Sequence, residues 1–148
     1  MKMLDKDTFN KDIEFSGSKG LVFIGNQILL YRRDGRTTRY PHYLDLPGGG
    51  REGHESPFDT FKRELKEEFG IDVTESDISF CSVHESISDP GMTGYFLVAK
   101  LGDALKKEVK PSEEVPEPMF MTLEEYLLQP DVIPKQVERI RAYLEHVN

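Results

Sequence analysis

Three glutamates close together suggest most of the chemistry that this sequence can perform. Glu64, Glu67 and Glu68 stand in the segment FKRELKEEFG, and a helix places them within an arc of about 100° on one side. Like charges at such spacings destabilise a helix unless they are neutralised. Arg63 lies four residues from Glu67, but one arginine does not balance three acids. A divalent cation is the natural partner, and carboxylate oxygens favour Mg²⁺, Mn²⁺ or Ca²⁺ over zinc.

A run of three glycines, Gly48 to Gly50, follows Pro47 shortly before these glutamates. Glycine lets the backbone bend sharply and approach a ligand closely. We therefore expect backbone carbonyls of this loop to complete the ligand shell of a metal, and the loop to lie beside a substrate. The competing interpretation is an acidic helix face that is simply solvated, as charge runs commonly are.

The helix that carries the glutamates has clear start and stop signals. Ser56 is a good N-cap, Pro57 suits the first helical position, and Asp59 stands where a capping box places an acid. Gly70 is a typical residue to end the helix. Four residues define the expected core face of this helix: Phe58, Phe61, Leu65 and Phe69.

The remaining elements predict a layered α/β domain with a mixed sheet. Expected strands cover 21–24 and 28–31, joined by a turn at Gly25-Asn26, and then 43–46, 78–84 and 95–101. Thr122 and Glu125 form a second capping box. The last helix carries an expected apolar stripe of Ile133, Val137, Ile140, Leu144 and Val147. Residues 1–148 thus read as one domain, with a polar arm at 1–14 and a Pro-rich, charged, mobile loop at 102–118.

Composition excludes several classes of function. The 148 residues contain 19 Lys plus Arg against 27 Asp plus Glu, a net charge of −8, which argues against a partner that is a nucleic acid polymer. No apolar run is long enough to span a membrane, and the charged start is unlike a signal peptide. The single cysteine, Cys81, excludes an intramolecular disulfide and a cysteine-cluster zinc site. We expect a cytoplasmic protein.

The stretch from Gly49 to Ile71 resembles the Nudix box, G-x5-E-x7-R-E-U-x-E-E-x-G-U, in which U is a bulky aliphatic residue. Nine specified positions over 23 residues agree: Gly49, Glu55, Arg63, Glu64, Leu65, Glu67, Glu68, Gly70 and Ile71. Such a match is far more specific than a lone glycine motif. The flanking segments LDLPGGG and MFMTLEEYL also resemble the family, so the resemblance covers roughly residues 15–147.

The resemblance implies a Nudix-type α/β/α sandwich and a Mg²⁺-dependent pyrophosphohydrolase, with Mn²⁺ as a substitute. Its substrate would be a nucleoside diphosphate linked to another group. The metal ligands carried over by position are Glu64, Glu67, Glu68 and the carbonyl of Gly48. Glu55 and Arg63 would hold the loop on the helix by a charge-assisted contact.

The general base stays open between a box glutamate and one from a later loop. Glu67 is the candidate within the box, and Glu113, Glu114 and Glu117 lie in the expected late region. A carboxylate at either place could take a proton from a water that metal ions have made more acidic.

Arginines before the glycine loop are the expected phosphate-binding groups. Arg32, Arg33, Arg36 and Arg39 are the only basic concentration in this acidic chain. We expect Arg33 or Arg32 to hold substrate phosphate, beside the backbone of Gly49 and Gly50.

The favoured substrate is a nucleoside triphosphate or an oxidised nucleotide, as for MutT-like enzymes, and ADP-ribose or a nucleotide sugar is the alternative. A non-catalytic nucleotide-binding regulatory module is the alternative of another class. Such a module would be expected to lack some of the specified residues of the Nudix box, whereas all nine are present in this sequence. The oligomeric state is open, with a homodimer among the alternatives.

Overall fold

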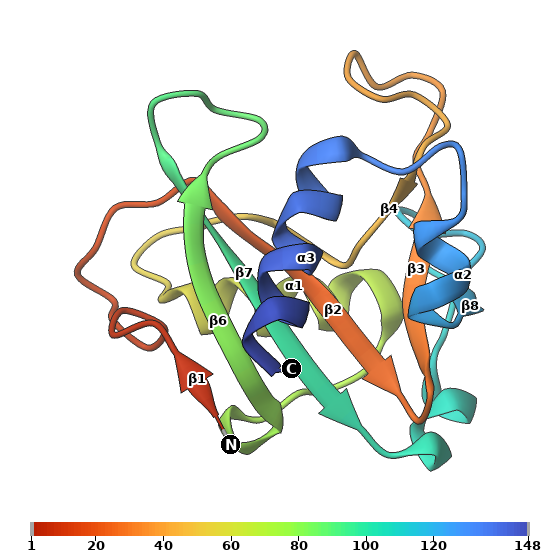
Figure 1. The fold of residues 1–148 in the computed structure, drawn as a ribbon, viewed down its shortest axis with the longest axis horizontal. Coiled ribbons are helices and arrows are strands. Elements are labelled where there is room, and N and C mark those ends of the chain that lie inside the picture. Colours follow the sequence, from red (N-terminus) through yellow and green to blue (C-terminus); the bar gives the residue numbers. More distant parts are fainter. Residues whose placement is uncertain (1, 148) are drawn as a thin grey trace.

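A mixed β-sheet lies between helices on its two faces, in the computed structural model, which describes residues 2–147 (Figure 1). This α/β/α arrangement is the expected fold class. The strands are β1 (Met3–Leu4), β2 (Gly17–Ile24), β3 (Gln27–Arg32), β4 (Leu44–Asp45), β5 (Gly48–Gly50), β6 (Ile78–Glu85), β7 (Thr93–Leu101) and β8 (Met119–Met121). The helices are α1 (Pro57–Phe69), α2 (Leu123–Leu127) and α3 (Pro134–Val147), with 3-10 turns η1 (Glu75–Asp77) and η2 (Asp103–Glu108).

Strand β2 organises the sheet, whose order is β1-β6-β7-β2-β3-β4. It pairs in parallel with β7 along its whole length, from Gly17 opposite Gly94 to Ile24 opposite Leu101. On its other edge, β3 pairs only with its last residues, after the expected turn. Strand β5 pairs antiparallel with its first residues, from Gly17 to Lys19. The glycine loop is therefore built into the sheet, beside the start of its central strand.

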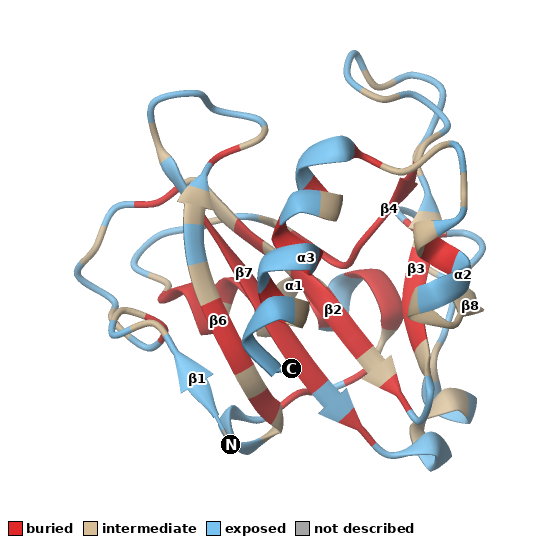
Figure 2. Cartoon of the chain, viewed as in Figure 1, coloured by how far each residue is buried: buried red, intermediate tan, exposed pale blue. Residues whose placement is uncertain are grey.

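Two hydrophobic clusters cover the two faces of the sheet. The expected core face of α1 is confirmed, because Phe61, Leu65 and Phe69 are fully buried and Phe58 nearly so. The opposite cluster includes Tyr126 of α2 with Ile140 and Tyr143 of α3. The buried colour of Figure 2 accordingly concentrates in the central strands and on the helix surfaces that face them. This packing fixes α1 and α3 on opposite sides of the first residues of β2.

The local signals around α1 are confirmed. The Ser56 hydroxyl accepts a hydrogen bond from the Asp59 amide, the Asp59 carboxylate accepts one from the Ser56 amide, and Pro57 is the first helical residue. Gly70 ends the helix in a left-handed conformation. The second capping box, Thr122 with Glu125, likewise opens α2.

The buried face of α3 differs from the expected apolar stripe. Ile140 is fully buried as expected, but Val147 is 52% exposed. The polar Gln136 and Arg139 are buried in its place, together with Tyr143. At 100° per residue this face is rotated by about 70° from the expected stripe. The rotation is possible because both polar side chains find hydrogen-bond acceptors inside the fold.

Residues 2–14, which the sequence predicts to be a polar arm, contact the domain through backbone hydrogen bonds. Strand β1 pairs in parallel with β6. Thr8 is fully buried, and its carbonyl accepts a hydrogen bond from the Phe58 amide at 3.0 Å. Backbone hydrogen bonds anchor this polar segment, which its composition does not reveal.

The segment 102–118, which the sequence predicts to be a mobile loop, also makes specific contacts with the domain. It begins with η2, and Val115 is buried in the α1 cluster. The Lys110 amide donates to the carbonyl of Phe69, and the Ser112 hydroxyl donates to the carbonyl of Glu68 at 2.8 Å. These bonds satisfy carbonyls that the last turn of a helix leaves without partners. The segment is thereby held against the end of α1 that carries the glutamates.

Within residues 2–147, no helix is long and apolar enough to cross a membrane.

His84, near the end of β6, offers a test of this packing through the pH dependence of stability. Burial, together with the nearby charge of Arg139, lowers the pKa of His84 to about 4. Its ring also contacts the Ser82 hydroxyl and packs edge-on against Phe96. Because the pKa in the unfolded chain is about 6.5, the unfolded chain binds more protons below that pH. The stabilisation by a neutral His84 is thus complete above pH 6.5 and is lost as the pH falls towards 4.

We expect a His84→Gln variant to lose less stability than the wild type between pH 6.5 and 4, by about 1–2 kcal/mol after solvent screening. Urea unfolding at several pH values measures this difference, and carboxylates that titrate in the same range cancel in the comparison. Parallel pH profiles for the two proteins would contradict the prediction.

Candidate active site

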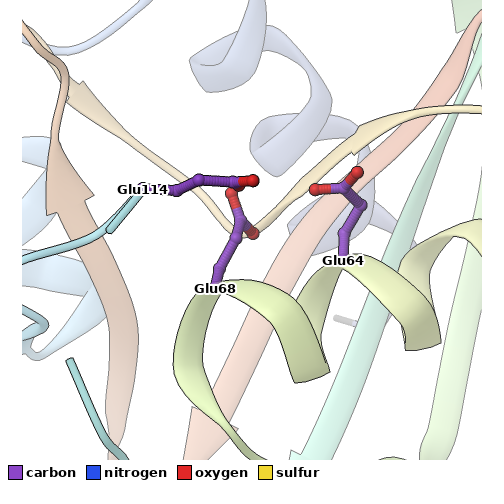
Figure 3. Close-up of side chains that lie close together, drawn as sticks. All are labelled: Glu64, Glu68 and Glu114. Carbon is purple, nitrogen blue, oxygen red and sulfur yellow. The ribbon is translucent and has the colours of Figure 1, made fainter. Parts of the chain in front are cut away.

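Three carboxylates meet at the end of α1 (Figure 3). Glu64 and Glu68 project from successive turns of the helix, and Glu114 reaches them from the segment after η2. One oxygen of each lies within 4.8 Å of the others. Of the late glutamates considered above, the structure brings Glu114 into this cluster. Its position follows from the hydrogen bonds that hold 110–112 against the end of α1.

Glu68 is the most enclosed member of the cluster, with 4% of its surface exposed. Its Oε1 accepts a hydrogen bond from the Gly48 amide at 3.0 Å. Burial raises the pKa of Glu68 to about 8, against the opposing effects of the Lys19 charge and of this hydrogen bond. Burial also raises the pKa of Glu64. Full ionisation of the cluster is therefore costly unless a cation is present.

Glu67 lies apart from this cluster. Its side chain is 45% exposed, and it forms an ion pair with Arg63 at 3.2 Å. The helix explains the difference, because Glu64 and Glu68 are about 40° apart around its axis whereas Glu67 is about 60° away from Glu64 on the other side. The role of Glu67 as a metal ligand stays a prediction.

Arg63 connects the glycine loop to the helix. Its Nε donates to Glu55 Oε2 at 2.7 Å, and its Nη2 donates to the carbonyl of Gly50 at 2.7 Å. Its Nη1 donates to Glu64 Oε1 at 2.8 Å. Charge-assisted bonds of this kind are the stronger hydrogen bonds in proteins. The geometry agrees with the holding role expected for Arg63 and Glu55.

The close approach of loop and helix requires glycine at two positions. Gly48 has a φ of +129°, and a Cβ there would lie 2.0 Å from the carbonyl oxygen of Ser18. A Cβ on Gly49 would lie 2.5 Å from Cδ of Glu64. A side chain at Gly48 would therefore clash with the backbone of β2, whereas one at Gly49 would displace the Glu64 carboxylate.

A second polar cluster surrounds Asp45, which is fully buried. Its Oδ2 accepts bonds from Arg33 at 2.7 Å and from Lys19 at 3.1 Å, and its Oδ1 accepts one from Gln136 at 3.1 Å. Burial acts to raise the pKa of Asp45, but the charge of Lys19 and the hydrogen bond from Arg33 outweigh it and the pKa is lowered. This ionised carboxylate holds two cations next to the glycine loop.

A pocket lies beside this cluster, between the start of β2, the loop before β4, the loop after β6 and α3. The backbone of Gly49 and Gly50 lines it, as expected for substrate-binding residues. Its charged and amide side chains are Lys19, Arg33, Arg39, Asp45, Gln136 and Arg139. Four cations against one carboxylate make this pocket positively charged in a protein of net charge −8.

Arg33 lines the pocket as expected, but Arg32 does not. Arg32 instead pairs with Asp131 and donates to the carbonyl of His42. Successive side chains of an extended chain point to opposite sides, so that these neighbours cannot both face the pocket. Arg32 thus lies outside this pocket lining, and a role for it in binding phosphate stays a prediction.

Four residues of the pocket were not expected from the sequence: Lys19, Asp45, Gln136 and Arg139. The position of Asp45 within LDLPGGG was a signal, because that segment leads directly into the loop. In α3, Tyr143 lies four residues after Arg139 and so on the same face of the helix. A large aromatic residue there was a signal that the buried surface extends beyond the apolar stripe. Lys19 has no such signal, because its role depends on the pairing of β2 with β5.

Comparison with known families decides the identity of the fold. The family model described as NUDIX domain matches residues 18–143. The chain belongs to the NUDIX domain family. The box from Gly49 to Ile71 lies within this matched range. No curated protein sequence matches the chain at a significant level.

Solved structures of Nudix proteins share the fold at low sequence identity. The MutT protein from Methanosarcina mazei Go1 superimposes with a TM-score of 0.68 at 21% identity, covering 99% of this chain and 96% of that one. An Ap4A hydrolase from C. elegans has a TM-score of 0.62 at 18% identity, covering 88% and 98%.

A bifunctional NMN adenylyltransferase/ADP ribose pyrophosphatase from Francisella tularensis also matches, with a TM-score of 0.67 at 18% identity. It is matched over 92% of this chain, which spans only 42% of that protein. The same bifunctional protein has a structure complexed with AMP and a Mn ion.

The close contact between the glycine loop and Glu64 can be tested by adding a methyl group at Gly49. We expect Gly49→Ala to displace the Glu64 carboxylate, because the new Cβ would clash with the end of that flexible side chain. Affinity for Mn²⁺ should fall by about tenfold or more, with little loss of thermal stability. Calorimetric titration with Mn²⁺ and thermal unfolding measure the two effects.

Gly50→Ala is the matched control, because a Cβ at Gly50 would meet nothing nearer than the Ser16 carbonyl oxygen at 3.8 Å. Equal Mn²⁺ affinity in the two variants would contradict the placement of Glu64 beneath Gly49.

Proposed function

We propose that this Nudix hydrolase is a divalent-metal-dependent pyrophosphohydrolase that cleaves the phosphoanhydride of a nucleoside diphosphate-linked substrate. The observation that carries the proposal is that the glycine loop lies between the carboxylate cluster and the cationic pocket and contacts both. Gly49 touches Glu64 on one side and lines the pocket on the other. A substrate in the pocket would thus place its phosphates beside the carboxylates.

The cluster fits a hard divalent cation. Glu64, Glu68 and Glu114 offer only oxygen donors, and those oxygens lie within 4.8 Å of one another, as the ligand shells of Mg²⁺ and Mn²⁺ require. Burial raises the pKa of Glu68 despite the nearby charge of Lys19, and a bound cation would favour its ionised form. Glu67 and the Gly48 carbonyl complete the proposed ligand set. When bound, the metal would neutralise phosphate charge and lower the pKa of a bound water.

The residues of the chain then have separate tasks. Arg63 keeps the loop at a fixed distance from the helix, so that the carboxylates and the pocket stay in register. Arg33 has an Nε with no partner among the described residues, and it lines the pocket. An anionic phosphate oxygen is the acceptor that this buried donor lacks.

Glu114 is the proposed general base. It is exposed, and it reaches the cluster from a segment outside the box. Glu64 is bound by Arg63 and Glu68 by the Gly48 amide. Glu114 therefore has a carboxylate available to take the proton of an attacking water.

The substrate class includes both of the substrates considered from the sequence, namely nucleoside triphosphates with their oxidised forms and ADP-ribose or nucleotide sugars. The structural neighbours include a MutT protein, an ADP ribose pyrophosphatase and an Ap4A hydrolase. A screen of such compounds with Mg²⁺ or Mn²⁺, read by phosphate release with coupling enzymes, tests the proposal. If the folded, metal-loaded protein released no phosphate from any of these compounds, the result would favour a non-catalytic nucleotide-binding regulatory module.

Replacement of Glu68 tests the metal site. We expect Glu68→Gln to lower turnover by about 10³-fold or more, because one charged ligand is removed. Thermal stability without metal should be unchanged or slightly higher, since the amide can still accept the Gly48 bond and no buried charge remains.

Steady-state kinetics and thermal unfolding measure these effects, with the exposed Glu124→Gln as the control. Activity within a few-fold of the wild type would refute the ligand assignment.

Replacement of Glu114 tests the base. We expect Glu114→Gln to lower kcat by about 10²-fold or more, whereas Glu113→Gln, the same change at an exposed neighbour outside the cluster, leaves kcat near the wild-type value. Steady-state kinetics at saturating Mg²⁺ separate this effect from weaker metal binding. Equal rates for the two variants would exclude Glu114 as the base.

A further inference from the structure

Arg139 is a buried cation without a counter-ion in the pocket. Only 5% of its surface is exposed, and no carboxylate among residues 2–147 lies within ion-pair distance of it. Its one hydrogen bond within the described chain goes from Nη2 to the Glu85 carbonyl at 2.7 Å. Lys19 and Arg33, by contrast, share Asp45. A buried charge without a partner is costly, and an anionic ligand would remove that cost.

Gln136, one turn before Arg139 on the same helix, is the second incomplete group. Its Nε2 donates to Asp45, and its Oε1 is buried without a hydrogen-bond partner among residues 2–147. The amide orientation is set by chemistry, because the ionised Asp45 carboxylate can only accept hydrogen bonds and so requires the NH₂ group to face it. Gln136 lines the pocket, so a small rotation of its side chain would let Oε1 accept a hydrogen bond from a ligand O–H or N–H.

These two groups are separated from the glutamate cluster by the central strand. Gly50 and Gly94 pair with Gly17 from opposite sides, and Arg139 lies next to Gly94. Two strand spacings amount to about 10 Å. An anion on Arg139 is consequently a different group from a diphosphate at the carboxylates.

We propose that Arg139 and Gln136 form a subsite for a sugar that carries a second negative charge, with the anionic group on Arg139 and a sugar hydroxyl donating to Gln136. This inference rests on the proposed function and narrows it. The substrate class would be a nucleotide conjugate that bears a phosphorylated or carboxylated sugar beyond its diphosphate.

His84 reports on this subsite without any hydrolysis, because the charge of Arg139 helps to lower the pKa of its imidazole. In protein kept free of metal by a chelator, we would follow the His84 ring by NMR during pH titrations. The probes are ribose 5-phosphate, glucuronate and ribose, all at saturating concentration. His84→Gln identifies the His84 signal among the four histidines.

We expect ribose 5-phosphate to raise the pKa of His84 by about half a unit or more, because it neutralises Arg139, and ribose to have no effect. A response to glucuronate as well would mean that the subsite accepts either anion, and its absence would assign the subsite to phosphate. No response to either anion, or an equal response to uncharged ribose, would overturn the proposal.

Arg139→Gln should already have a higher His84 pKa and should not respond to the probes, while Arg36→Gln, in the exposed loop before β4, should respond as the wild type does. If Arg139→Gln does not fold, Arg139→Lys replaces it in the experiment, because lysine keeps the positive charge. We expect Arg139→Lys to bind ribose 5-phosphate several-fold more weakly than the wild type does. A full response in Arg139→Gln would contradict the assignment. Because this titration uses metal-free protein, it measures binding at the subsite independently of hydrolysis. The subsite proposal and the proposed hydrolase activity can therefore be refuted independently.

Discussion

Arg63 joins the two parts of the site that the chain brings from different elements. Its guanidinium donates to Glu55, to Glu64 and to the carbonyl of Gly50. Glu55 and Gly50 belong to the loop, whereas Glu64 belongs to the helix, so one rigid planar group sets the distance between them. The hydrogen bond from the Gly48 amide to Glu68 is a second contact between the loop and the helix. The glycines then make the short distance sterically possible.

Two charge clusters of opposite sign share this loop. Burial raises the pKa values of Glu64 and Glu68 on the α1 side, so a cation beside them would favour their ionised forms. The pocket on the other side has more cations than its one carboxylate, Asp45, can neutralise. Under the proposed function, a metal-bound diphosphate would complement both clusters.

Helix α3 gives up part of an apolar surface to complete the pocket. Its buried side carries Gln136 and Arg139 along with Ile140 and Tyr143. Gln136 donates one hydrogen bond to Asp45, and Arg139 donates one to the Glu85 carbonyl. Both side chains can make further hydrogen bonds. Regions of the fold that bind a ligand differ in this way from a core optimised only for packing.

The sequence by itself determined the features that depend on local chemistry. Ser56 and Gly70 set the ends of α1, the spacing of Phe58 to Phe69 set its buried face, and Gly25-Asn26 set a hairpin. Such signals depend on backbone geometry within a few residues. The pattern from Gly49 to Ile71 likewise indicated the family that the comparison confirmed.

Only the tertiary structure decided which distant groups meet. Glu114 joins Glu64 and Glu68 because the chain folds back on the end of α1, and Lys19 meets Asp45 because β2 pairs with the glycine loop. The burial of Gln136 and Arg139 depends on how α3 is rotated against the sheet. Such contacts join residues far apart in the chain, and their energies depend on burial and on partners that no local pattern specifies.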